Sequence, residues 1–453
     1  MTLNLPDDFI QSVSCCPGFD KDAFITAHLN NSPTSIRVNP FKQTQLNFTL
    51  NKAVAWNKYG FYLNERPNFT HDLLFQAGCY YVQEAGSMFI QHALTSHVDF
   101  NETILALDVC ASPGGKSTLL ASLLNEKSAL VANEVVKQRA EVLSQNLTKW
   151  GNSNVVVTNN DPASYSAIPE TFDLIMVDAP CSGSGLFRKQ PDAINEWSLE
   201  NVNLCSQRQK RILSDILGSL KSGGTLVYST CSYSIEENEN IVNWLISEFG
   251  LISLPIPIEA NWGIVETHYA ENDFYGYRFY PDKTQSEGFF CSLLKKPGAS
   301  NNHRQFRKSK FENFTALKAK EKEVFNDWIH NPEVHLITKF KEDFLLTNEL
   351  VMDFINKYPQ LYFKKVGTTI GNVIKKEVIP HHDLALSIHR SSSIQTIVCN
   401  REEGLQFFKK SLVTIEGQKG WNLLTFNGFG LGWIKHLGNR INNYLPNDLR
   451  VLK

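Results

Sequence analysis

Short apolar runs alternate with longer amphipathic stretches through the middle of the chain. The first run, from Ile104 to Val109, is almost continuously apolar, which is typical of a strand buried on both faces of a parallel sheet. Strands that alternate with helices predict an α/β fold with a doubly wound, mostly parallel sheet. The later expected strands are 129–134, 155–159, 172–180, 223–232 and 288–296, and the expected helices are 136–149, 199–220 and 235–249.

The segment before this region has a weaker pattern. Residues 1–75 combine a short helical start with strand-like stretches, which predicts a small α/β appendage. Arg37 and Asn39 alternate with apolar residues in the stretch 34–40 and are interpreted as an exposed strand face. A helix is predicted over residues 80–94, where the central region begins.

The C-terminal part is less regular. Residues 295–310 contain six Lys or Arg and no acid, which predicts a basic linker that is either a solvated hinge or a contact for RNA phosphates. A long amphipathic helix is expected over 314–329, and the Gly- and Asn-rich tail 427–450 predicts a small β-rich module. The predicted domains are 1–75 (appendage), 76–296 (doubly wound domain), 297–312 (linker) and 313–453 (C-terminal region).

Composition narrows the class of protein. Of the 453 residues, 42% are hydrophobic and the formal net charge is −2, so contact with nucleic acid must come from local patches. The nine cysteines are scattered and form neither a disulfide framework nor a zinc-binding pattern, which favours a reducing, cytoplasmic setting without a metal. We expect no signal peptide and no membrane span, because the first twenty residues lack a basic start and no apolar run reaches about 18 residues.

The first apolar run leads into a Pro- and Gly-rich loop that is typical of a ligand site. A Walker A loop would need Gly where Cys110 stands, and Pro113 breaks the dinucleotide pattern GxGxxG. A plain strand–turn–helix crossover remains possible, but the loop also suits a nucleoside ligand without a polyphosphate, such as S-adenosylmethionine. The candidate loop residues are Cys110, Ala111, Ser112, Pro113, Gly114, Gly115 and Lys116.

Acidic residues recur where the expected strands end. Asp108, Glu134 and Asp178 end or directly follow three strands, and Asp161 follows a fourth. Ligands of doubly wound sheets bind beyond these carboxyl ends. Glu134 lies 19 residues after Gly115, close to the spacing at which an acid accepts hydrogen bonds from ribose hydroxyls. Any one of these acids alone is explained as an ordinary loop residue. Their repetition at four strand ends is what indicates a ligand site.

Two cysteines follow buried strands at the same predicted sheet edge. Cys181 stands in DAPCSGSG, where amino-group methyltransferases have an aromatic residue, and Cys231 stands in YSTCS. This substitution indicates methylation of a pyrimidine carbon, which needs a nucleophile. A thiolate that adds to carbon 6 of cytosine activates carbon 5, while Asp178 can support the ring near nitrogen 3. The expected positive charge that favours the thiolate is Lys189, Arg188 or the sulfonium of the methyl donor itself. The spacing alone leaves the choice of nucleophile between the two cysteines open.

These motifs resemble the Sun/Nop family of RNA (cytosine-5) methyltransferases in order and spacing. The resemblance covers 76–296 and rests on DVCASPGGKST, Glu134, Asp161, DAPCSGSGLFRK and STCSYSIEENE. Upstream, RVNP and GFYL look like the family's N-terminal RNA-binding portion. The tail is similar to the PUA-like module of bacterial RsmF-type enzymes, which modify small-subunit ribosomal RNA. Two departures are Ser112 in place of the common Ala and QSEGFF in place of GEGFF.

The resemblance implies a Rossmann-like, S-adenosylmethionine-dependent domain and a role for each site residue. Cys231 is implied as the nucleophile, and Cys181 as the residue that assists product release. Residues 110–116, Glu134, Asp161 and Asp178 are implied as the cofactor site. The expected partner is 16S rRNA or the small ribosomal subunit, bound by a monomer. Transfer RNA as the substrate, and a non-catalytic assembly factor, are the alternatives.

Overall fold

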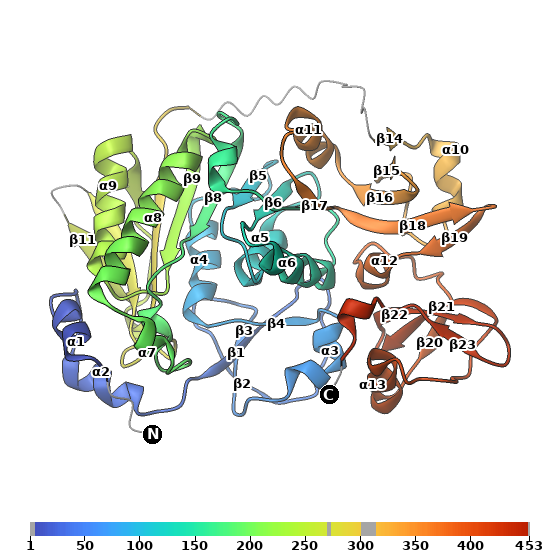
Figure 1. Ribbon diagram of the computed structural model, residues 1–453, viewed down its shortest axis with the longest axis horizontal. Coiled ribbons are helices and arrows are strands. Elements are labelled where there is room, and N and C mark those ends of the chain that lie inside the picture. Colours follow the sequence, from blue (N-terminus) through green and yellow to red (C-terminus); the bar gives the residue numbers. More distant parts are fainter. Residues whose placement is uncertain (1–4, 270–272, 300–313, 452–453) are drawn as a thin grey trace.

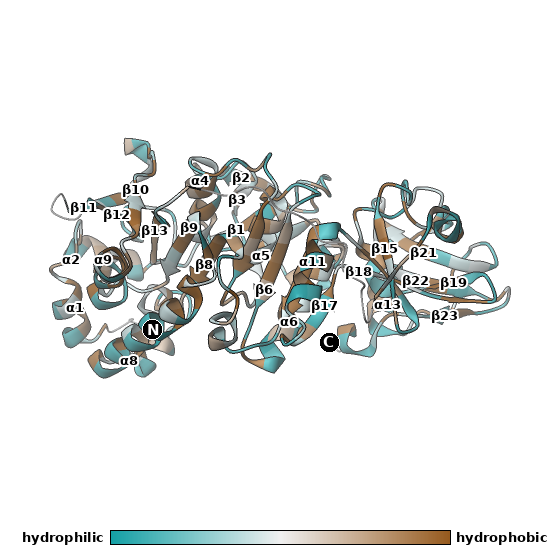
Figure 2. Cartoon of the chain, turned by 90° about the horizontal axis from the view of Figure 1, so that it is seen from above, coloured by the Kyte–Doolittle hydropathy of each residue, from teal (hydrophilic) through white to brown (hydrophobic). Residues whose placement is uncertain are grey.

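A computed structural model describes residues 5–269, 273–299 and 314–451. A large twisted sheet occupies the middle of the molecule, and two smaller sheets lie to its right in Figure 1. Seen from above in Figure 2, the molecule is elongated, and hydrophobic residues concentrate on the central strands.

The central sheet has the strand order β11-β12-β13-β9-β8-β5-β6-β7-β17, and β10 pairs with β13. The five strands from β9 to β7 are parallel, which confirms the doubly wound fold expected from the sequence. The strands are β5 (Leu105–Asp108), β6 (Ala129–Asn133), β7 (Val155–Thr158), β8 (Phe172–Asp178), β9 (Leu220–Thr230), β10 (Ile252–Leu254), β11 (Val265–Tyr269), β12 (Phe274–Phe279), β13 (Phe289–Lys295) and β17 (Phe363–Val366).

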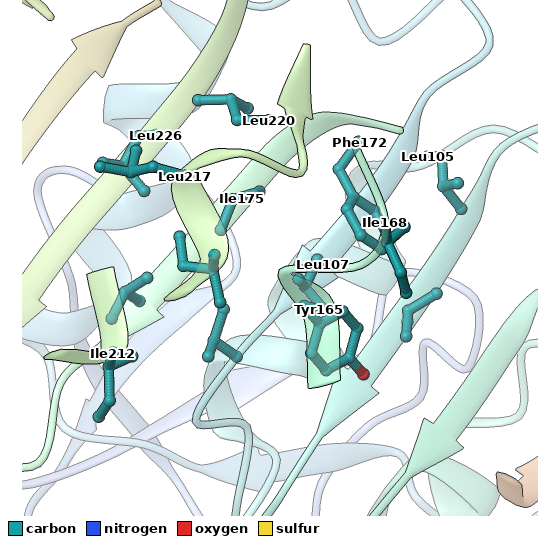
Figure 3. Packing of buried hydrophobic residues seen from close by; sticks show 14 of the residues in the cluster. Leu105, Leu107, Tyr165, Ile168, Phe172, Ile175, Ile212, Leu217, Leu220 and Leu226 are labelled. Atoms are coloured by element: carbon teal, nitrogen blue, oxygen red, sulfur yellow. The ribbon is translucent and has the colours of Figure 1, made fainter. Parts of the chain in front are cut away.

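Helices cover both faces of this sheet because alternate strand residues point to opposite sides. Leu105 and Leu107 lie in one buried cluster with Ile212 of α8, as Figure 3 shows. Ala106 lies in the opposite cluster with Leu119 of α5. The covering helices are α4 (Phe89–Thr95), α5 (Gly115–Leu123), α6 (Lys137–Trp150), α8 (Leu199–Leu217) and α9 (Glu239–Phe249).

The N-terminal segment forms its own antiparallel sheet, in the order β2-β3-β1-β4. The helix expected from residue 80 is wrong at its start, because Tyr80–Val82 forms β4 and pairs with β1. This sheet therefore extends beyond the boundary expected after residue 75. The other elements of the segment are α1 (Asp7–Val13), α2 (Lys21–His28), β1 (Thr34–Val38), β2 (Leu50–Ala53), β3 (Gly60–Leu63) and α3 (Leu73–Gln76).

The C-terminal region contains two more sheets, β14-β15-β16-β18-β19 and β20-β21-β22-β23. Their elements are β14 (Thr315–Ala316), α10 (Ala319–Lys322), β15 (Leu336–Phe340), β16 (Asp343–Thr347), α11 (Glu349–Lys357), β18 (Thr368–Ile374), β19 (Glu377–Pro380), α12 (His382–Leu386), β20 (Thr396–Val398), α13 (Arg401–Lys409), β21 (Gly420–Phe426), β22 (Phe429–His436) and β23 (Ile441–Asn443). Most of the predicted basic linker lies outside the described residues.

The long helix predicted over 314–329 is wrong. Thr315 and Ala316 pair with β15 instead, and the ring of Phe314 stacks on Phe340 with centroids 4.7 Å apart. Only the short helix α10 and a 3-10 turn, Glu323–Phe325, follow. Pairing with a distant strand therefore overrides the local helix preference of this Lys- and Glu-rich stretch.

The C-terminal region also completes the central sheet. Strand β17 pairs antiparallel with β7, so that edge of the sheet is covered. Helix α11 adds Val351 and Phe354 to the same buried cluster as Leu105 and Leu107. Residues 349–366 are thus built onto the central domain and are not part of a separate module.

Candidate active site

The two cysteines meet at the carboxyl ends of β8 and β9. These strands are parallel neighbours, and their register sets Asp178 beside Ser229. Cys181 and Cys231 follow at the same edge, and their Sγ atoms lie 3.2 Å apart. The pairing predicted from the two strand ends is therefore present in the structure, with both side chains partly exposed.

Glu237 holds the two cysteine loops together. Its carboxylate accepts hydrogen bonds from the Ser182 amide at 2.8 Å and from the hydroxyls of Ser182 and Ser232, each at 2.5 Å. Asn238 braces the Cys231 loop alone, since its side-chain amide donates to the Ser232 carbonyl at 2.8 Å. Burial raises the pKa of Glu237, while these donors oppose the shift. Sequence reasoning missed this residue, although it lies within the motif STCSYSIEENE.

An ion pair lies next to the cysteines. Lys116 Nζ is 2.7 Å from Asp178 Oδ2, and the Ser229 hydroxyl donates to Asp178 Oδ1 at 2.9 Å. Burial alone would lower the pKa of Lys116, but the charges of Asp178 and Cys231 outweigh it and raise the pKa. Lys116 therefore stays protonated. The hydrogen bond to Cys231, followed by burial, raises the pKa of Cys181, which stays a neutral thiol.

The other two expected cations form no hydrogen bond or ion pair with the cysteines among the described residues. Lys189 is exposed, and its side chain forms no hydrogen bond or ion pair with the residues that the structure describes. Arg188 is paired with Glu287 at 3.0 Å. The cation beside the cysteine pair is Lys116, which the sequence placed only in the ligand loop.

The loop from Cys110 to Lys116 lies between β5 and α5 and has the features of a ligand cradle. Gly114 has φ +113°, a left-handed conformation that favours glycine, and α5 begins at Gly115. Ser117 donates to Asp108 Oδ2 at 2.6 Å, whereas Asp108 Oδ1 is buried and has no hydrogen-bond partner among the described residues. Burial raises the pKa of Asp108 to about 7. An unpaired buried acceptor behind the loop is what a site completed by a polar ligand would have.

The remaining acids occupy the next two strand ends. Glu134 follows β6 with a buried side chain that accepts a hydrogen bond from the Val136 amide at 2.9 Å. Asp161 follows β7 and accepts from the Ala163 amide at 3.0 Å, while Arg211 lies 3.3 Å away. Carboxylates at successive strand ends suit the hydroxyls and the amino group of a nucleoside, so the chain's residues fit S-adenosylmethionine.

Arg37 differs from its expected position on an exposed face. It is fully buried and donates from Nη2 to the Thr118 hydroxyl at 2.6 Å and to the Gly115 carbonyl at 3.2 Å. Its guanidinium also lies over the Trp150 ring. Asn39 is buried as well, and both residues fasten the N-terminal sheet to α5 and α6. An Arg between apolar residues was the only signal of this role in the sequence.

The described residues contain neither a membrane-spanning helix nor a metal site. Within residues 5–269, 273–299 and 314–451, no helix has the length and hydropathy that crossing a membrane requires. In the same part of the chain, no three His, Cys, Asp or Glu side chains come together as a metal site.

Comparison with known proteins gives the family. Residues 94–295 match the 16S rRNA methyltransferase RsmB/F family, residues 5–85 the N-terminal domain of 16S rRNA methyltransferase RsmF, and residues 395–451 the methyltransferase RsmF PUA domain. Ribosomal RNA small subunit methyltransferase F of Aliivibrio salmonicida is 32% identical over 98% of this chain and 97% of its own. The protein of that name from Shewanella loihica is 29% identical over 99% and 96%.

A solved structure is also similar to this chain. A methyltransferase homolog protein from Pyrococcus horikoshii is 30% identical, covers 65% of this chain and 96% of its own, and superposes with a TM-score of 0.54. The chain therefore belongs to the ribosomal RNA small subunit methyltransferase F family, and it is an rRNA methyltransferase.

Proposed function

We propose that this protein forms 5-methylcytosine in 16S rRNA, with S-adenosylmethionine as the methyl donor. The observation that carries the proposal is the pair of thiols 3.2 Å apart beside an acid and a lysine. Carbon methylation of a pyrimidine needs a nucleophile and a group that resolves the adduct. The proposed enzyme acts as a monomer in the cytoplasm, on free RNA or on the small ribosomal subunit.

Each residue of the site has a proposed role in the reaction. Cys231 adds to carbon 6 of the cytosine, with Lys116 favouring the thiolate. Asp178 hydrogen-bonds the ring near nitrogen 3 as charge builds there. Residues 110–116, Glu134 and Asp161 would hold S-adenosylmethionine, which supplies an electrophilic methyl group when it is bound. Cys181 then assists the loss of the carbon 5 proton and the departure of Cys231.

Three variants test the order of these steps. Cys231→Ala should bind RNA yet form neither adduct nor product. Cys181→Ala should accumulate a protein–RNA species that survives denaturing electrophoresis, because its release is slowed. The double variant should show no such band, since removing the first step hides the second. A covalent band from Cys231→Ala would reverse the two assignments.

The substrate is tested separately. Methyl transfer from labelled S-adenosylmethionine to total RNA, followed by gel separation, should label 16S rRNA. Label in transfer RNA alone would contradict the proposed substrate, and absence of label from active-site-intact protein would contradict the activity.

A further inference from the structure

A polar groove of about 880 Å³ lies between the N-terminal segment and the central domain. One wall is formed by the connection from α2 to β1 and by the ends of β2 and β3, and the other by residues 281–285. The α2–β1 connection runs along the lower edge of Figure 1. The volume falls within the range of natural ligand sites, roughly 300–1,000 Å³. No role assigned above uses this groove.

Amide side chains dominate its lining. Asn31, Asn51, Asn64 and Gln285 are exposed there, and none of their amides has a hydrogen-bond partner within the described part of the chain. Each amide offers both donors and an acceptor, the combination that recognises base edges. Arg66 adds an exposed positive charge, and Glu65 beside it adds an exposed negative one. The apolar residues of the lining are few and, apart from one leucine, small, so it offers little to a protein segment.

The floor of the groove is fixed by buried contacts. Arg188 binds Glu287, and Ser32 donates to the same carboxylate at 2.6 Å. Arg188 also donates to the Ser286 carbonyl at 2.8 Å. The side chains of Arg188 and Glu287 are only 6% and 3% exposed. The two walls are therefore held in place before any ligand binds.

Backbone hydrogen bonds connect the segment that follows one wall of the groove to the loops of the cysteine pair. Gly288, next to Glu287, donates from its amide to the Gly185 carbonyl at 3.1 Å, and the Gly185 amide donates to the Cys231 carbonyl at 2.8 Å. A side chain at Gly185 would place its Cβ 2.6 Å from the Cys231 carbonyl oxygen, so the backbones touch here. The groove and the loops of the cysteine pair are therefore held on one framework.

We propose that this groove binds the single-stranded nucleotides that flank the target cytosine, and that its amides read their base edges. The inference rests on the proposed function, because it assumes an RNA cytosine at Cys231. Single-stranded RNA fits better than a duplex, since unpaired bases expose the edges that amides can reach.

The test uses the full-length protein and fluorescein-labelled RNA oligonucleotides. Each carries one cytosine flanked by uridines, adenosines or guanosines, and a duplex of the same length serves for comparison. Asn31→Ala, Asn64→Ala and Gln285→Ala should each weaken binding of single-stranded RNA by about three- to tenfold. The loss should differ between the flanking bases, while S-adenosylmethionine binding stays unchanged. Asn326→Ala changes an exposed amide near α10, on the opposite side of Figure 1, and should match the wild type.

Two results would overturn the inference. Unchanged RNA affinity in all three variants would remove the groove from the RNA path. An equal loss for every flanking base, with a reduced salt slope, would indicate phosphate contacts and exclude base reading. Failure of the proposed function would have a different readout. The wild-type protein would then show no methyl transfer, whatever the RNA affinities of the variants are.

Discussion

Lys116 belongs to the loop proposed to hold the cofactor, and its ammonium pairs with Asp178. The charge of Cys231 is among the causes that raise the pKa of Lys116. Removing the positive charge should slow the attack of the Cys231 sulfur on cytosine. For Lys116→Gln we expect single-turnover adduct formation to be about tenfold slower, and Lys116→Arg should restore part of the rate. An unchanged rate in Lys116→Gln would exclude Lys116 as the activating cation.

Asp108 gives a prediction about stability. Burial raises its pKa from 3.8 to about 7, so the folded state holds more protons than the unfolded chain between these values. Stability should therefore fall as pH rises through this window, by up to about 4 kcal/mol. Asp108→Asn can keep the Ser117 contact and should remove most of the dependence. Denaturant unfolding without cofactor at pH 5 and pH 8 compares the two proteins, and parallel pH profiles would contradict the assignment.

Single residues were predictable where strand ends position them. Cys181 and Cys231 were found because each follows a buried strand. The role of Glu237 and the ion pair between Lys116 and Asp178 were not predictable, since both depend on which loops meet in space. Arg37 was misplaced for the same reason, because its partners lie in a helix distant in sequence.

At the scale of elements, the alternation of buried strands and helices predicted the central sheet well. Continuous apolar runs such as β5 and β6 can be buried only between two layers, so their placement follows from composition. Short strands that mix polar and apolar residues were harder to predict from the sequence. β4 and β14 exist because they pair with β1 and β15, and such pairing leaves little trace in a local pattern.

The start of β17 fastens the loop that carries Asp161. Asn160 accepts a hydrogen bond from the Tyr362 amide at 3.0 Å and donates to the Tyr362 carbonyl at 3.2 Å. Losing both contacts in Asn160→Ala should loosen this loop and weaken S-adenosylmethionine binding about tenfold. Asn400→Ala removes the cap of α13 and controls for general destabilisation. If calorimetry gave the same S-adenosylmethionine affinity for the two variants, the contacts of Asn160 with the start of β17 would have no specific effect on cofactor binding.

At the scale of the whole molecule, three parts of the chain meet at Lys42. Its ammonium donates to the carbonyls of Ala77 at 2.9 Å, and of Lys149 and Leu386, each at 2.6 Å. These acceptors belong to the N-terminal segment, the end of α6 and the end of α12. The regions 5–85 and 94–295, which match separate family models, are therefore joined to each other and to α12 through this one side chain.

Two truncations test this integration. A chain that ends at Lys296 loses α11 and β17, which exposes an apolar surface and the edge of β7, so we expect it to aggregate or to bind cofactor weakly. A chain that ends at Ser393 keeps both elements and should still bind S-adenosylmethionine, while RNA affinity and its salt dependence fall. Calorimetry and RNA titration compare the two. Normal cofactor binding by the shorter chain would show that β17 is dispensable.

The position of β17 in the chain has a consequence for biosynthesis. A ribosome releases β7 long before β17, so the nascent protein presents an unpaired sheet edge while the rest of the C-terminal region is made. Premature termination anywhere in that interval leaves the edge open. Cells should therefore degrade incomplete copies of this enzyme instead of accumulating a partly active methyltransferase.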